Sequence, residues 1–179
     1  MLFRSSKVSE TLTPPQTFTP EDVLDYIYAV LHTPQYREQY KAFLKIDFPR
    51  VPYPKDAADW DFKVKQGGIL RGLHLLESDD VEDYVTQFPE SGDNLVGKPR
   101  FEASAADDTV GKVWLNGAQY FDGVPLAAWD FYIGGYQPAQ KWLKDRIGRR
   151  LTFEEVLHYQ KMIRALWGTV EVMGRLETF

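Results

Sequence analysis

The sequence contains no cysteine among its 179 residues. A disulfide scaffold, a thiolate metal site and a cysteine nucleophile are therefore excluded, and this composition suits a reducing cytoplasm. No segment approaches the roughly 18 to 20 consecutive apolar residues that a membrane span needs. The start, MLFRSSKVSETLTPPQ, also lacks the apolar region of a secretory signal. We therefore expect a cytoplasmic protein with no membrane partner.

The chain also lacks an excess of positive charge, because 21 Lys and Arg face 26 Asp and Glu, a net charge of −5. A non-specific polyanion binder would be basic, so that class is excluded. Residues 1–90 carry 10 basic and 15 acidic side chains (10 − 15 = −5), whereas residues 91–179 carry 11 of each. Within 137–150 five basic residues accompany Asp145 alone (5 − 1 = +4). Such a local excess attracts an anionic partner, although solvated basic loops are common.

Aromatic residues make up 15% and hydrophobic residues 44% of the chain, which is enough to build a core. A chain of this length typically forms one domain. Residues 1–18 are polar, include Pro14-Pro15 and show no periodicity, so we predict a flexible arm or linker there. Residues 19–179 are then a single domain.

Helix signals are strong in the first part of the chain. Residues 19–22, Thr-Pro-Glu-Asp, have the N-cap, proline and acidic first turn of a helix start, and apolar spacing predicts an amphipathic helix over 20–32. Thr33-Pro34 repeats the signal and predicts a second helix that ends before Pro49. The prolines of 48–54 predict a rigid extended connector.

Two further long helices are expected. The first covers 57–77 and contains Gly67-Gly68, which lower its stability by about 1 kcal/mol each and permit a close packing contact or a kink. The last helix begins with a capping box formed by Thr152 and Glu155, and its apolar face continues to about residue 174.

The middle of the chain has a different pattern. Glycines punctuate short segments over 78–125, and Asn116-Gly117 is a hairpin-type dipeptide. We predict a small antiparallel sheet of three to five strands, with 128–133 as one more strand, and a short helix over 137–145. The fold class is therefore α+β, with N-terminal helices, a small antiparallel β-sheet in the middle and C-terminal helices.

Motifs for nucleotide or metal chemistry are incomplete. Residues 92–98 match the first seven positions of a phosphate-binding loop, but Pro99 stands where Ser or Thr would bind magnesium, and proline removes a backbone N–H. His32, His74 and His158 lie far apart and show no metal-ligand spacing. We predict no metal site and no cofactor in this chain.

Three acidic pairs are the remaining catalytic candidates: 79–80, 82–83 and 107–108. Paired carboxylates can perform acid–base catalysis, for example in a small hydrolase, but acidic clusters in glycine-rich loops are more often solvated turns. No nucleophile elbow, dinucleotide fingerprint or amino-methyltransferase motif is present. We therefore predict no catalytic residue, and no enzyme activity in the isolated chain.

Basic side chains suited to DNA phosphates and base edges remain as candidates for binding. Each one alone is more often a plain surface charge. The candidates are Lys63, Lys65, Arg71, Lys98, Arg100, Lys112, Arg146, Arg149 and Arg150.

Two stretches of the sequence are distinctive. The first is TPEDVLDYIYAVLHTPQYREQY at 19–40, followed by FLKIDFPRVPYP at 43–54. The second is DFYIGGYQPAQKWLKDR at 130–146, followed by LTFEEVLHYQ at 151–160. Together they resemble the C-terminal specificity region of single-chain restriction-modification enzymes, the Type ISP group and its predicted helicase and DNA methyltransferase relatives.

The resemblance implies a target-recognition domain that reads a short asymmetric sequence in double-stranded DNA and presents the adenine to a methyltransferase. S-adenosylmethionine, ATP and magnesium would then belong to upstream methyltransferase and ATPase domains of the same polypeptide. The chain would be an excised fragment or a shortened homologue. We expect the glycine-rich 92–123 and the loop at 145–150 to approach the DNA. The alternative is a protein-interaction module that docks on the methyltransferase without reading DNA, which the charge of −5 favours.

Overall fold

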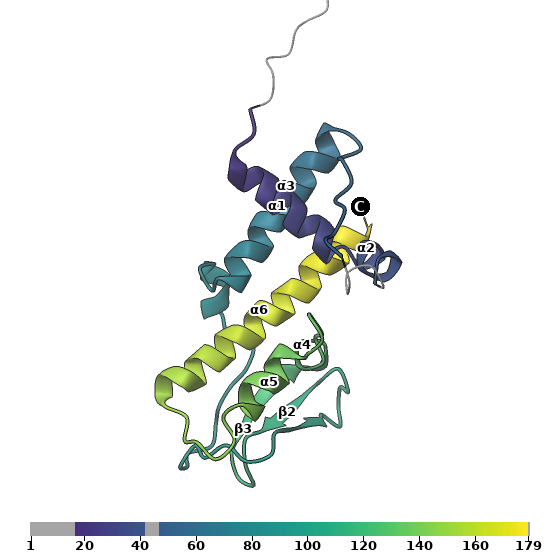
Figure 1. Ribbon diagram of the computed structural model, residues 1–179. Helices are drawn as coiled ribbons and strands as arrows, with labels where there is room; N and C mark the ends of the chain where they lie inside the picture. Colours follow the sequence, from purple (N-terminus) through teal and green to yellow (C-terminus); the bar gives the residue numbers. More distant parts are fainter. Residues whose placement is uncertain (1–16, 42–46, 179) are drawn as a thin grey trace, which may run out of the picture.

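The computed structural model describes residues 17–41 and 47–178. The elements lie in this order: α1 (Pro20–His32), α2 (Pro34–Gln39), α3 (Ala57–His74), the short 3₁₀ helix η2 (Asp79–Glu82), β1 (Arg100–Ala103), β2 (Val110–Trp114), β3 (Tyr120–Pro125), α4 (Leu126–Trp129), α5 (Pro138–Lys144) and α6 (Phe153–Thr178). Figure 1 shows α1 and α3 at one end, α6 through the middle, and the sheet with α4 and α5 at the other end. The predicted α+β class is confirmed.

The N-terminal helices largely follow their sequence signals. Thr19 caps α1 in a reciprocal capping box with Asp22, as its Oγ1 accepts from the Asp22 N–H at 3.1 Å. The second helix is shorter than predicted, because α2 ends at Gln39, and residues 42–46 lie outside the described residues. Residues 48–54 form neither helix nor strand. The predicted arm over 1–18 falls almost wholly outside the described residues as well.

Helices α1 and α3 cross closely, as Figure 1 shows. A Cβ atom placed on Gly67 would lie 1.8 Å from the backbone oxygen of Asp25, so only glycine allows this approach. The buried Asp25 carboxylate receives two hydrogen bonds from Arg71, at 2.7 and 3.0 Å. The predicted close contact at the glycine pair is confirmed.

A histidine pair, with His32 buried and His74 partly buried, lies beside this crossing. The His32 and His74 ring centroids are 5.4 Å apart. His74 hydrogen-bonds with the Tyr28 hydroxyl through Nδ1 at 2.5 Å and with the Thr169 hydroxyl through Nε2 at 2.8 Å. Burial, and to a lesser extent the neighbouring His32, lowers the pKa of His74 to about 4. Both rings are therefore neutral at neutral pH, since burial lowers the pKa of His32 too.

The sheet has the order β1-β2-β3, and both neighbouring pairs are antiparallel. The predicted hairpin around Asn116-Gly117 is confirmed, with Val113 opposite Phe121 and the Leu115 N–H donating to the Gln119 oxygen at 2.9 Å. Side chains alternate along β2, so that Val113 is fully buried while Lys112 and Trp114 lie on the outer face.

The prediction of a strand over 128–133 is wrong. Residues Leu126–Trp129 form the one-turn helix α4. Two neighbouring residues, Ala128 and Trp129, are both buried, whereas a strand would place them on opposite faces. The two apolar side chains occupy adjacent positions. A helical turn can bury both of them against α6, whereas a strand would leave one of the two exposed.

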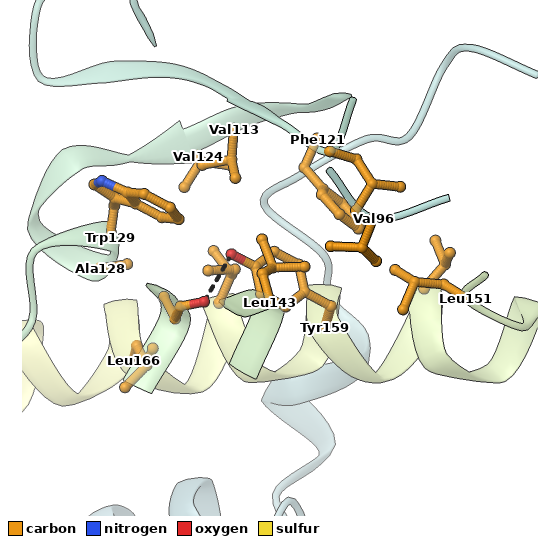
Figure 2. Close-up of a cluster of buried hydrophobic side chains, with 14 of the residues drawn as sticks. Val96, Val113, Phe121, Val124, Ala128, Trp129, Leu143, Leu151, Tyr159 and Leu166 are labelled. Atoms are coloured by element: carbon orange, nitrogen blue, oxygen red, sulfur yellow. Dashed lines mark hydrogen bonds between the residues drawn. The ribbon is translucent and has the colours of Figure 1, made fainter. Parts of the chain in front are cut away.

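Helix α6 carries the main core (Figure 2). Tyr159 is fully buried. Its ring is tilted against the Phe121 ring, with 4.5 Å between ring centroids, and its hydroxyl donates to the Ala139 oxygen at 3.3 Å. The same helix supplies Val172 and Leu176 to a second core under α1 and α3. The two ends of the molecule are thus joined by one helix.

Replacing Gly67 with Ala should destabilise the chain by about 3 kcal/mol, because the new methyl overlaps the α1 backbone. Urea denaturation measures this change. Gly174→Ala is the matched control, since a Cβ there meets nothing within 4 Å and alanine favours the helix. Equal stability of the two variants would contradict the close crossing.

The stability of the chain should fall in mild acid because of His74. Its pKa is about 6.5 in the unfolded chain and about 4 when folded, so the unfolded state binds more protons and stability is lost as pH falls from 6.5 to 4. This loss is on the order of 3 kcal/mol at most. His74→Asn should flatten the dependence of unfolding free energy on pH, while His158→Asn, at an exposed ring, should leave most of it. Parallel curves for wild type and His74→Asn would refute this assignment.

Candidate functional site

A tight turn connects α5 to α6 at the sheet end of the molecule (Figure 1). The Arg149 N–H donates to the Arg146 oxygen at 2.9 Å, which places Ile147 and Gly148 at the two central positions. Gly148 has φ of +82°, the left-handed value that glycine adopts freely. We call residues 146–150 the arginine turn.

The arginine turn is fixed to the segment 93–98 by backbone hydrogen bonds. The Val96 N–H donates to the Arg149 oxygen and the Gly148 N–H to the Val96 oxygen, each at 2.8 Å, and the Leu151 N–H donates to the Asn94 oxygen at 3.0 Å. The structure therefore brings together the two regions, 92–123 and 145–150, that the sequence marked as candidates.

A network of hydrogen bonds around the buried Gln119 amide holds the segment 93–98 in place. Gln119 is 1% exposed and uses its whole amide: Nε2 donates to Asn94 Oδ1 at 2.8 Å and to the Glu90 oxygen at 3.1 Å, while Oε1 accepts from the Asn94 N–H at 2.9 Å and from Asn116 Nδ2 at 3.1 Å. Asn94 has a positive φ of 54°. Sequence reasoning missed both residues, because a polar residue beside a hairpin turn has the pattern of a solvated loop.

One carboxylate holds two of the arginines. Glu155 Oε1 accepts from Arg149 Nη2 at 3.1 Å and from Arg146 Nε at 3.4 Å. Its Oε2 accepts from the Thr152 N–H at 3.0 Å, so the predicted capping box is present too. The Thr152 backbone hydrogen bond, followed by Arg149 and Arg146, lowers the pKa of Glu155, which stays ionised.

The three arginines differ in what remains free for a ligand. Arg146 lies over the Trp142 ring at 3.7 Å, donates to the Trp142 oxygen at 3.0 Å, and its side chain is 23% exposed. The side chains of Arg149 and Arg150 are 60% and 70% exposed. Arg150 forms a long ion pair with Asp93, with 3.7 Å between Nη2 and Oδ2. Arg146 shapes the turn, whereas Arg149 and Arg150 face solvent.

Two of the remaining candidates lie on the outer face of the sheet and already have partners. Arg100 pairs with Glu102 at 2.5 Å and lies over the Trp114 ring at 4.8 Å. Lys112 lies 4.1 Å from the Tyr120 ring centroid. Lys98 is exposed at the end of the segment 93–98 that is hydrogen-bonded to the arginine turn.

The α3 candidates lie elsewhere. Arg71 pairs with the buried Asp25 and Lys63 with the buried Asp59, while Lys65 is exposed. Helix α3 packs on α1 and on the C-terminal half of α6, whereas the arginine turn precedes the N-terminus of α6. The structure does not bring these three residues to the turn.

The acidic pairs lie in exposed local structure. Asp107 Oδ1 accepts from the Thr109 N–H at 2.9 Å and closes a turn, and Glu82 pairs with Lys161 across to α6. Lys98-Pro99 is followed by strand β1, where a phosphate-binding loop would continue as a helix. Among residues 17–41 and 47–178, no group of three or more His, Cys, Asp or Glu is placed to hold a metal ion.

An open apolar groove of about 910 Å³ lies between α6 and the end of the sheet. Its polar side chains are Thr109 and the exposed Asp130. The lining residues are Val85, Thr109, Val110, Gly123, Pro125, Leu126, Ala127, Asp130, Trp167 and Val170.

A family model described as the Type ISP C-terminal specificity domain matches residues 4–175. The chain belongs to this family. A search of curated proteins found no match. In the part of the chain that the structure describes, no helix is long and apolar enough to cross a membrane.

Solved structures of three longer chains share the fold of this specificity domain. The DrdV–DNA complex matches with a TM-score of 0.68 and 22% identity over 90% of this chain. The Type ISP enzyme LlaBIII bound to DNA matches with a TM-score of 0.64 and 18% identity over 90%. A nuclease-deletion mutant of the Type ISP enzyme LlaGI with a DNA substrate mimic matches with a TM-score of 0.63 and 19% identity over 88%. The match covers 18%, 11% and 14% of those three chains, respectively.

Gly148→Ala should destabilise the specificity domain by about 1 kcal/mol, because its φ of +82° is unfavourable for any residue with a Cβ. Gly117→Ala is the control: a Cβ there also meets nothing within 4 Å, and its φ is not positive. We expect Gly117→Ala to change stability by less than about 0.5 kcal/mol. Thermal denaturation of both variants tests the turn geometry, and equal stabilities would speak against it.

Proposed function

We propose that this specificity domain recognises a short target sequence in double-stranded DNA for a Type ISP restriction-modification enzyme. On this proposal it positions the DNA for an adenine methyltransferase in upstream domains of the same polypeptide. Family membership supports the proposal, as does the fold shared with enzymes solved on DNA. The match covers less than a fifth of each of those chains, and on this proposal the chemistry belongs to other domains.

The arginine turn is the observation that carries the proposal. Arg149 and Arg150 expose two guanidinium groups on a backbone that is already fixed by hydrogen bonds to 93–98. Guanidinium binds phosphate well and pairs with guanine in the major groove through two hydrogen bonds. A pre-organised turn loses little conformational entropy on binding. The geometry therefore suits sequence recognition better than a mobile basic loop would.

The nine basic candidates then divide by role. We assign contacts with DNA to Lys98, Arg149 and Arg150, and a positioning role to Arg146. The other basic candidates lie on the sheet face and on α3, and most of them pair within the chain. Polar residues of 92–98 lie beside the exposed arginines and are the candidates for reading bases.

The acidic net charge is compatible with this role. The deficit lies in residues 1–90, and helices α1, α2 and α3 of that segment lie at the end of the molecule away from the arginine turn, whereas residues 85–90 run along the sheet, where the Gln87 N–H donates to the Asp122 oxygen at 3.0 Å. Exposed charges more than about 8 Å apart are largely screened at physiological salt, so the local arginines dominate the potential at their own surface.

The cofactors of such an enzyme would bind elsewhere. S-adenosylmethionine serves methylation, and ATP with magnesium serves ATP hydrolysis; on this proposal the upstream methyltransferase and ATPase domains hold them. The isolated specificity domain then has no catalytic activity of its own and acts in the cytoplasm, where the DNA is.

The apolar groove favours a second role, docking on the methyltransferase without DNA reading. Its apolar lining, including Trp167 and Val170, would bury well against another domain. The two roles separate experimentally, because docking predicts no dependence on the arginine turn.

Arg149→Ala/Arg150→Ala should weaken binding to DNA and flatten its salt dependence. Each lost phosphate contact lowers the slope of log affinity against log salt by about 0.9, so the double variant should lose about 1.8. Fluorescence anisotropy with labelled duplexes of random sequence measures both quantities, for the chain alone and for the chain fused to its upstream region.

The control for this experiment is Lys55→Ala/Lys65→Ala, which removes the same charge from the exposed helical end. It should leave the salt slope nearly unchanged. An equal loss in both double variants would mean that net charge alone drives binding. An unchanged slope in the arginine variant would refute the proposed surface.

A further inference from the structure

The tip of the arginine turn is apolar. Ile147 is 54% exposed at the second position of the turn, where proline and polar residues are usual. Leu95 is 37% exposed on the segment that is hydrogen-bonded to the turn. Two large apolar side chains therefore face solvent at the point where the guanidinium groups are concentrated.

Backbone hydrogen bonds fix the turn and keep Ile147 from folding back into the core. Gly148 is bonded to the Val96 oxygen at 2.8 Å, and the Ile147 N–H donates to the Lys144 oxygen at 3.3 Å. On the two sides of the tip, Arg146 and Arg149 share the Glu155 carboxylate. The exposed isoleucine is thus presented by a rigid backbone.

We propose that Ile147 is an apolar wedge that inserts at a base step of duplex DNA. The observation behind it is a rigid apolar tip flanked by Arg149 and Arg150. Apolar side chains such as isoleucine unstack base steps and bend the duplex when neighbouring cations hold the phosphates. The flanking charge fits a DNA partner better than an apolar protein surface, which would have to bury the arginines.

This inference rests on the proposed function and adds a mechanism to it. Bending or unstacking has an energy cost that depends on the base step, so the wedge would contribute to sequence discrimination without a hydrogen bond to any base. Pyrimidine–purine steps deform most easily. We therefore expect such a step inside the recognised sequence.

The experiment uses duplexes enriched from a random pool by the wild-type chain, with 2-aminopurine placed at each step in turn. Wild type should raise the fluorescence at one step, because the base there loses its stacking. Ile147→Ala should abolish this rise and weaken affinity about tenfold, since it removes buried apolar surface. Its salt slope should match wild type, because no charge is changed.

Two further variants complete the design. Ile147→Met keeps a large apolar tip and should retain the fluorescence signal. Val23→Ala removes apolar surface at an exposed position of α1, 44% exposed, and should behave as wild type. Ile147→Met tests whether the fluorescence rise needs a large apolar side chain at the tip. Val23→Ala tests whether the loss of affinity is specific to the tip.

The possible failures are distinguishable. If the wild-type chain binds no duplex, alone or fused to its upstream region, both the proposed function and the wedge are overturned. The wedge alone is overturned if the wild-type chain binds but 2-aminopurine fluorescence rises at no step. The same holds if Ile147→Ala keeps both the fluorescence rise and the affinity. Loss of contact with the upstream region in Ile147→Ala, with DNA binding intact, would also overturn the wedge and assign the tip to a protein contact.

Discussion

Burial of apolar surface along helix α6 is the interaction on which the rest of this structure depends. The N-terminal half of the helix places Tyr159 and Ile163 against the sheet, and the C-terminal half places Val172 and Leu176 under α1 and α3. At 26 residues the helix is about 39 Å long, enough to serve two separate cores. A small three-stranded sheet has little core of its own, so its position is set by this helix.

The arginine turn depends on the start of the same helix. Glu155 caps α6 through Thr152 with one oxygen and holds Arg146 and Arg149 with the other. Helix initiation and the shape of the candidate surface are thus coupled through a single carboxylate. The buried amide of Gln119 fixes the opposite side through Asn94. The exposed arginines are therefore positioned by the partly exposed Glu155 and, through Asn94, by the buried Gln119.

The basic side chains of the sheet face have different neighbours from those of the arginine turn. Arg100 is satisfied by Glu102 and Trp114, and Lys112 lies over Tyr120. Surface pairs of this kind contribute little to stability and leave little net field for a ligand. On the turn, three neighbouring arginines share the two carboxylates of Glu155 and Asp93. Counting basic residues along the sequence treated these positions as equivalent, and only their neighbours in space separate them.

The sequence by itself determined the elements that local rules control. The caps at Thr19 and Thr152 and the hairpin at Asn116-Gly117 follow from neighbours within a few residues, and the two distinctive stretches already indicated the family. The glycine pair indicated a close contact, but only the fold supplies its partner, the Asp25 backbone on α1. The tertiary structure alone decided that Ala128 and Trp129 form a helical turn, since burial against α6 outweighs strand propensity. It also decided which carboxylate each arginine pairs with and how exposed each guanidinium remains, because Glu155 and Asp25 reach their partners only after the chain has folded.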